Sequence, residues 1–132
     1  MTKPYTRNTI LYAAGESAWG FQFSGLVSVT VLSVLISKHG GSAIEAGAIA
    51  GIENIAIVAQ LAGLYLFHSR RHRKRRLLKW YVFIAIPMLL VMGLINHSSL
   101  AISPSMRRVG LLATFGVYMA LTHAGISAWN DW

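Results

Sequence analysis

The chain has 132 residues, of which 55% are hydrophobic and 12% are charged, and its mean hydropathy is +0.52. Soluble domains carry about 25% charged residues, so this composition excludes an ordinary water-soluble fold and indicates a membrane protein. Twelve basic residues against four acidic ones give a formal charge of +8, and the absence of cysteine excludes disulfides and thiolate metal sites.

Four apolar segments are long enough to cross a bilayer, which takes about 20 mostly apolar residues. They lie at residues 12–37, 43–67, 77–95 and 109–129. The connections between them are short, so neighbouring helices should pack antiparallel. The sequence therefore predicts an all-α polytopic membrane protein in which residues 1–132 form a single domain of four transmembrane helices.

Polar side chains inside these spans are the candidates for a solute or proton path, because each is costly in lipid and turns toward protein or a cavity. Gln22 lies in the first span, and Glu53, Asn54 and Gln60 lie in the second. Glu53 and Gln60 are seven residues apart and therefore share a helix face. The alternative is that these groups only form interhelical hydrogen bonds, which contribute about 0.6 kcal/mol each on average. His123 in the fourth span is expected to be a packing residue.

The second span also carries a stripe of small residues. Ala43, Gly47 and Gly51 are spaced by four, which puts them on one face of the helix. Small residues at this spacing let another transmembrane helix approach closely. We therefore expect this face to contact other transmembrane helices or a larger membrane complex.

Residues 68–76 form a basic loop between the second and third spans. Its cations are Arg70, Arg71, Arg73, Lys74, Arg75 and Arg76. A nucleic-acid interface is disfavoured, because no stacking aromatics alternate with the charges and the flanking spans leave no room for a fold. We expect the loop to lie against anionic lipid head groups, where each Lys or Arg contributes roughly 1 kcal/mol.

The distribution of Lys and Arg predicts the orientation. Nine cations (Lys3, Arg7, the six of the basic loop and Lys79) fall on the side of the N-terminus, and three (Lys38, Arg107 and Arg108) fall on the other side. The positive-inside rule places the nine-cation side in the cytoplasm. Four crossings then put both termini in the cytoplasm, and a bacterial inner membrane is the expected location.

The segment "QLAGLYLFHSRRHRKRRLL", residues 60–78, resembles the loop between helices two and three of major facilitator superfamily (MFS) transporters. That loop has a glycine near the end of helix two, then an acidic residue, then a run of Arg and Lys. Gly63 matches the glycine and the run from Arg70 to Arg76 matches the basic part, whereas His68 or Ser69 stands at the acidic position. The resemblance implies that these residues form a gating loop.

Two further segments are similar to the same family. "VLSVLISKHGGSAIEAGAIAGIENIAIVAQLAG" is similar to helix one, the short turn and helix two, and "GISAWNDW" is similar to the cytoplasmic end of helix four. The resemblance implies the N-terminal four helices of an MFS half. It implies a secondary transporter that moves a small solute by alternating access.

The alternative function is a shortened, non-transporting accessory subunit of a larger respiratory or photosynthetic membrane complex. Four helices are fewer than the six of an MFS half, which favours this alternative. An enzyme is not expected, because the sequence has no glycine-rich phosphate loop, no supported catalytic triad and no carboxylate pair in a soluble pocket. We likewise expect no metal, no cofactor and no nucleic acid.

Overall fold

The computed structural model describes the backbone of residues 3–21, 28–68 and 73–130, and the side chains of residues 8–17, 28–68 and 75–126. The described residues are helical and include no strand, which confirms the all-α class for this part of the chain. The elements in chain order are α1 (Lys3–Phe21), α2 (Val29–Lys38), α3 (Ala43–Ala56), α4 (Ala59–Leu66), α5 (Arg73–Trp80), the π-helix η2 (Tyr81–Ala85), α6 (Ile86–Asn96) and α7 (Pro104–Asn130).

Within the described residues, three helical stretches are long and apolar enough to cross a membrane, which indicates a membrane protein. They are Ala43–Leu66, Arg75–Asn96 and Pro104–Ile126, at the positions of the second, third and fourth expected spans. The third and fourth begin earlier than expected, because α5 starts within the basic loop and α7 starts at Pro104.

The first expected span, residues 12–37, is not among the three. It falls on α1, on residues 22–27, which lie outside the described part, and on α2. A new helix begins inside the expected span, because the hydroxyl of Ser28 accepts a hydrogen bond from the backbone N–H of Val31 at 3.2 Å and caps α2. With 10 residues, α2 is only about 15 Å long, half of a hydrocarbon core.

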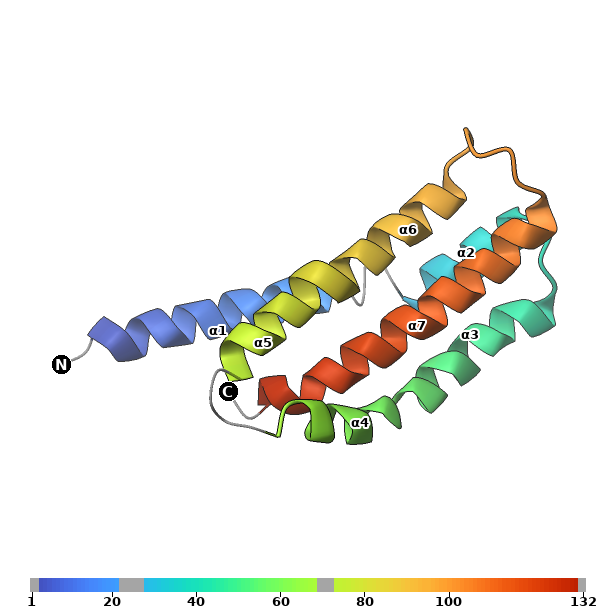
Figure 1. Cartoon of the computed structure of the whole chain (residues 1–132). Helices are drawn as coiled ribbons and strands as arrows, with labels where there is room; N and C mark the ends of the chain where they lie inside the picture. The colour runs from blue at the N-terminus through green and yellow to red at the C-terminus, as the bar shows by residue number, and fades with distance from the viewer. Residues whose placement is uncertain (1–2, 22–27, 69–72, 131–132) are drawn as a thin grey trace.

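Helix α7 is the centre of the bundle. It lies between α3–α4 on one side and α5–α6 on the other, while α2 packs beside it at one end (Figure 1). In the most apolar window of the α7 span 44% of residues are buried, against 17% and 11% in the other two. The core it organises contains Leu32, Ile36, Ile49, Ala56, Ala85, Met92, Leu111, Phe115, Tyr118 and Met119.

The outward faces of the spans are apolar. Ile44 is 85% exposed, Ile55 is 74% exposed and Phe83 is 72% exposed. Exposure of so many large apolar side chains is unfavourable in water, where burial of such surface is the main driving force of folding. These faces therefore suit lipid or neighbouring transmembrane helices.

Two of the three spanning stretches are interrupted. In Ala43–Leu66, residues 57–58 separate α3 from α4. The backbone there forms hydrogen bonds between residues three apart, from the N–H of Val58 to the carbonyl of Ile55 at 3.0 Å and from the N–H of Gln60 to the carbonyl of Ile57 at 3.0 Å. In Arg75–Asn96, η2 ends two residues before Pro87, whose ring would clash with the carbonyl four residues earlier in a regular α-helix. Interruptions of this kind concentrate at functional sites.

Candidate functional site

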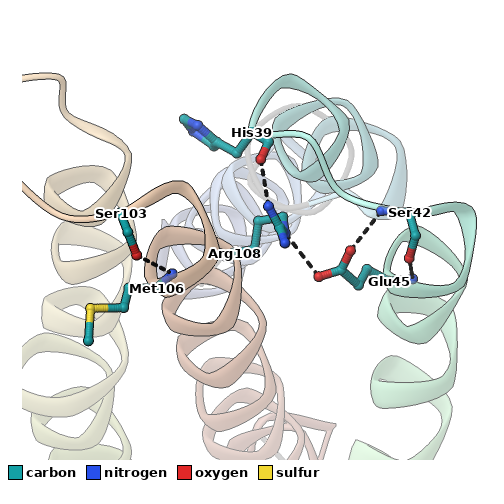
Figure 2. Close-up of polar contacts among 6 residues, drawn as sticks. All are labelled: His39, Ser42, Glu45, Ser103, Met106 and Arg108. Atoms are coloured by element: carbon teal, nitrogen blue, oxygen red, sulfur yellow. Dashed lines mark hydrogen bonds and ion pairs between the residues drawn. The ribbon is translucent and has the colours of Figure 1, made fainter.

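A polar cluster joins the start of α7 to the turn between α2 and α3. Arg108 donates from Nε to Oε1 of Glu45 at 3.0 Å and from a terminal guanidinium nitrogen to the carbonyl of His39 at 2.8 Å (Figure 2). The other carboxylate oxygen of Glu45 accepts the backbone N–H of Ser42 at 2.7 Å, and the hydroxyl of Ser42 accepts the N–H of Glu45 at 3.2 Å. This capping box fixes the start of α3. We call this end of the bundle, residues 38–45 and 95–108, the arginine end.

The neighbouring Arg107 closes the end of α6. Its side chain is buried, with 7% of the residue exposed, and it donates to the carbonyls of Ile95, His97 (2.7 Å) and Leu100 (2.9 Å). The last carbonyls of a helix have no partner within it, so a guanidinium with several donors can satisfy them. Arg107 and Arg108 were assigned to a loop from the sequence, but they lie inside α7.

The early start of α7 has a local cause. The hydroxyl of Ser103 accepts the backbone N–H of Met106 at 3.2 Å, as Figure 2 shows, and Pro104 occupies the first helical position. A serine cap followed by proline is a common helix start. The dipeptide Ser103-Pro104, which lies between the third and fourth expected spans, is therefore the sequence signal for this boundary.

One of the predicted path residues contacts α7. The amide nitrogen of Gln60 lies 3.2 Å from Nδ1 of His123, and both residues are half-buried. Glu53 is also half-buried and lies seven residues before Gln60, on the same face of the stretch. We call Glu53, Gln60 and His123 the polar triad. Sequence reasoning found its first two members but not their partner, because His123 is 63 residues away from Gln60.

The other predicted path residues lie elsewhere. Asn54 is exposed, and its side-chain amide donates to the carbonyl of Ala50 in its own helix at 3.0 Å. Gln22 lies outside the described residues. The structure therefore does not bring Asn54 to the polar triad.

The predicted gating loop is described only in part. Gly63 is buried within α4, and its carbonyl accepts the N–H of Phe67 at 2.9 Å. Arg75 and Arg76 are exposed on α5. Arg70 and Arg71 lie outside the described residues, and for Arg73 and Lys74 only the backbone, at the start of α5, is described.

The small-residue stripe is open. Ala43, Gly47 and Gly51 are exposed, and a Cβ at either glycine would meet nothing within 4 Å. No helix in the described part of the chain covers this face. A different glycine serves the contact between α3 and α7, since a Cβ at Gly116 would lie 3.4 Å from the side chain of Ile52.

Aromatic side chains hold the opposite end of the bundle. The indole N–H of Trp80 donates to the carbonyl of Leu121 at 2.9 Å, and its ring meets Phe67 edge to face at 5.7 Å between centroids. Gly125 leaves room for Tyr81, because a Cβ there would lie 2.7 Å from the Tyr81 hydroxyl oxygen. These contacts attach both α4 and the start of the third span to α7.

The described residues include no group of three or more histidine, cysteine, aspartate or glutamate side chains that could hold a metal ion. Comparison of the chain with protein-family models, with curated proteins and with solved structures gives no match. The site is therefore interpreted from its own geometry.

We expect Arg107→Lys to lower the free energy of unfolding by about 1–3 kcal/mol, because one ammonium group cannot replace the guanidinium at three carbonyls and leaves buried acceptors unpaired. Thermal unfolding in detergent, followed by circular dichroism, measures the change. Arg75→Lys at an exposed position of α5 is the control and should leave the melting temperature unchanged. Equal melting of the two variants would contradict the role of Arg107.

Proposed function

We propose that the chain is the N-terminal part of an MFS-like secondary transporter and moves a small solute across a membrane. The observation that carries the proposal is the polar triad. Glu53 and Gln60 flank the interruption at residues 57–58 of a spanning stretch, and Gln60 meets His123 of the central helix. Transporters of this kind bind substrates and coupling ions near mid-membrane, often where a helix is discontinuous.

The energetic cost of the triad supports a functional role. Glu53 lies near the middle of the Ala43–Leu66 span. A charged side chain at the centre of a membrane helix costs about 2.5–3.5 kcal/mol on insertion scales. A purely structural contact could be built from smaller polar groups, so an ionisable residue in this place favours a path for a solute or a proton.

The proposed orientation places the arginine end outside the cell and both termini in the cytoplasm of a bacterium. Arg107 and Arg108, two of the three cations on the proposed outer side, are bound to carbonyls and to Glu45. On the proposed cytoplasmic side, Arg75 and Arg76 are exposed. Exposed cations of this kind would favour contact with anionic head groups, and with Gly63 they would form the gating loop that the family resemblance implies.

Replacing the carboxylate of Glu53 tests the transport proposal. Glu53→Gln should abolish proton or solute movement without removing the protein from the membrane, because the amide keeps the shape but cannot ionise. Glu53→Asp, which keeps the charge, should retain activity. Proton flux is followed with a pH-sensitive dye in membrane vesicles from cells that produce the chain, with equal protein amounts verified by immunoblot. Unchanged flux in Glu53→Gln relative to the original chain would overturn this function.

A second candidate function is a non-transporting subunit of a larger membrane complex, such as a respiratory or photosynthetic one. The open face at Ala43, Gly47 and Gly51 favours it, since no helix in the described part of the chain fills that face. Packing against small residues is a main source of helix association in lipid. A transporter would cover the same face with its own further helices.

Both candidates predict a partner at the glycine face. The double variant Gly47→Leu and Gly51→Leu should weaken the association, because the added side chains block close helix approach. Native mass measurement after extraction in mild detergent detects the partner. Ala48→Leu, also exposed on α3, adds the same side chain beside the stripe and should retain the complex. A stable 14.5 kDa monomer of the unchanged chain would contradict the expectation.

A further inference from the structure

The contact between Gln60 and His123 specifies a protonation state. The side-chain amide nitrogen of glutamine carries two hydrogens and can only donate. It faces Nδ1 of His123 at 3.2 Å, and in this arrangement Nδ1 accepts the hydrogen bond. A neutral imidazole with an accepting Nδ1 carries its hydrogen on Nε2.

The other ring nitrogen points to a use beyond packing. Nε2 of His123 is buried and has no hydrogen-bond partner among the described residues. Buried polar atoms in native proteins are usually paired, and the exceptions often belong to sites that bind something. Nε2 keeps its hydrogen in both the neutral and the charged ring, so a change of charge falls on Nδ1, the nitrogen that faces Gln60.

Few charged groups face the imidazole. The titratable side chains described on the elements that pack against this part of α7, and on α7 beside it, are Glu53, Tyr65, Arg75, Arg76, Lys79, Tyr81 and Tyr118. Tyr65 is 91% exposed, and the three cations of α5 are also exposed. Among these described groups, Glu53 is the half-buried acidic residue, and it lies on the same helix face as Gln60.

We propose that His123 is a proton-binding site within the membrane and that the Gln60 carboxamide turns over to match its protonation state. Nδ1 takes a proton from hydronium that enters along the bundle, and the ring becomes an imidazolium. Its new Nδ1–H then needs an acceptor, which the carboxamide supplies by presenting its oxygen instead of its nitrogen. Glu53 provides the compensating negative charge. This proton site rests on the proposed transport function, and it would make the proton the coupling ion of that transport.

The position of Gln60 suits this role. It is the second residue of α4, directly after the interruption at residues 57–58. The backbone hydrogen bonds there join residues three apart, and such bonds have poorer geometry than those of an α-helix. A change in the side-chain contact can therefore alter the packing of α4 on α7 more easily than it could within a regular helix.

The test is a pH titration of the full chain in lipid nanodiscs with ¹⁵N-labelled histidine, followed by two-bond ¹H–¹⁵N correlation NMR. The His123 signals are assigned by their loss in His123→Gln. His97, exposed after α6, serves as an internal control within each sample. The neutral form of His123 should show a protonated Nε2 and an unprotonated Nδ1, and lowering the pH should convert the ring to the imidazolium.

The variant Gln60→Glu places a carboxylate on Nδ1 and should raise the proton affinity of His123 at least tenfold, about one pH unit in the midpoint, while the midpoint of His97 is unchanged. A ring that stays neutral throughout, a neutral form protonated on Nδ1, or a midpoint indifferent to Gln60→Glu would overturn the proposal. The titration requires no solute and no gradient. Its failure is therefore distinguishable from a failure of transport in the Glu53 variants.

Discussion

The rest of the bundle depends on how α3 and α4 align with α7, and one end of that alignment is marked by the ion pair between Arg108 and Glu45. It joins α3 to α7 across 63 residues of sequence, and the same separation recurs at Gln60 and His123, fifteen residues further along each helix. Both stretches thus run in the same direction, and the two contacts are about 22 Å apart along the axis. Ile52 and Gly116 meet between them, where the missing side chain allows close approach. One alignment therefore fixes the arginine end and the polar triad together.

Backbone satisfaction explains why arginines stand at the start of α7. The N-terminus of a helix disfavours positive charge, but α2 and α6 end beside it with unpaired carbonyls. Arg108 donates a hydrogen bond to the carbonyl of His39, and Arg107 donates to the carbonyls of Ile95, His97 and Leu100. In lipid an unpaired backbone group costs several kcal/mol. At the opposite end, the indole N–H of Trp80 donates to the carbonyl of Leu121. Hydrogen bonds therefore attach α7 to its neighbours at both ends.

The apolar pattern predicted the helical membrane class and three of the spans, because length and hydropathy alone decide those. It also identified Glu53 and Gln60, since an ionisable or amide group within a span is conspicuous. It could not identify His123 as their partner, because the register between α3–α4 and α7 depends on contacts distant in sequence. The interruption at residues 57–58 could not be predicted, because neither residue is a glycine or a proline. The capping box at Ser42 and Glu45 was readable from the spacing, but the ion pair to Arg108 was not.

The parallel register of α3–α4 on α7 is the central claim, and cysteine cross-linking tests it directly because the chain has no native cysteine. The double variant Ile52→Cys and Gly116→Cys should form an intramolecular disulfide on mild oxidation in membranes, which protects both thiols from a polyethylene-glycol maleimide. The pair Ile52→Cys and Ala120→Cys, about one helical turn away, should stay open and be labelled. Protection of the shifted pair, or of neither pair, would show that the helices do not pack in this register.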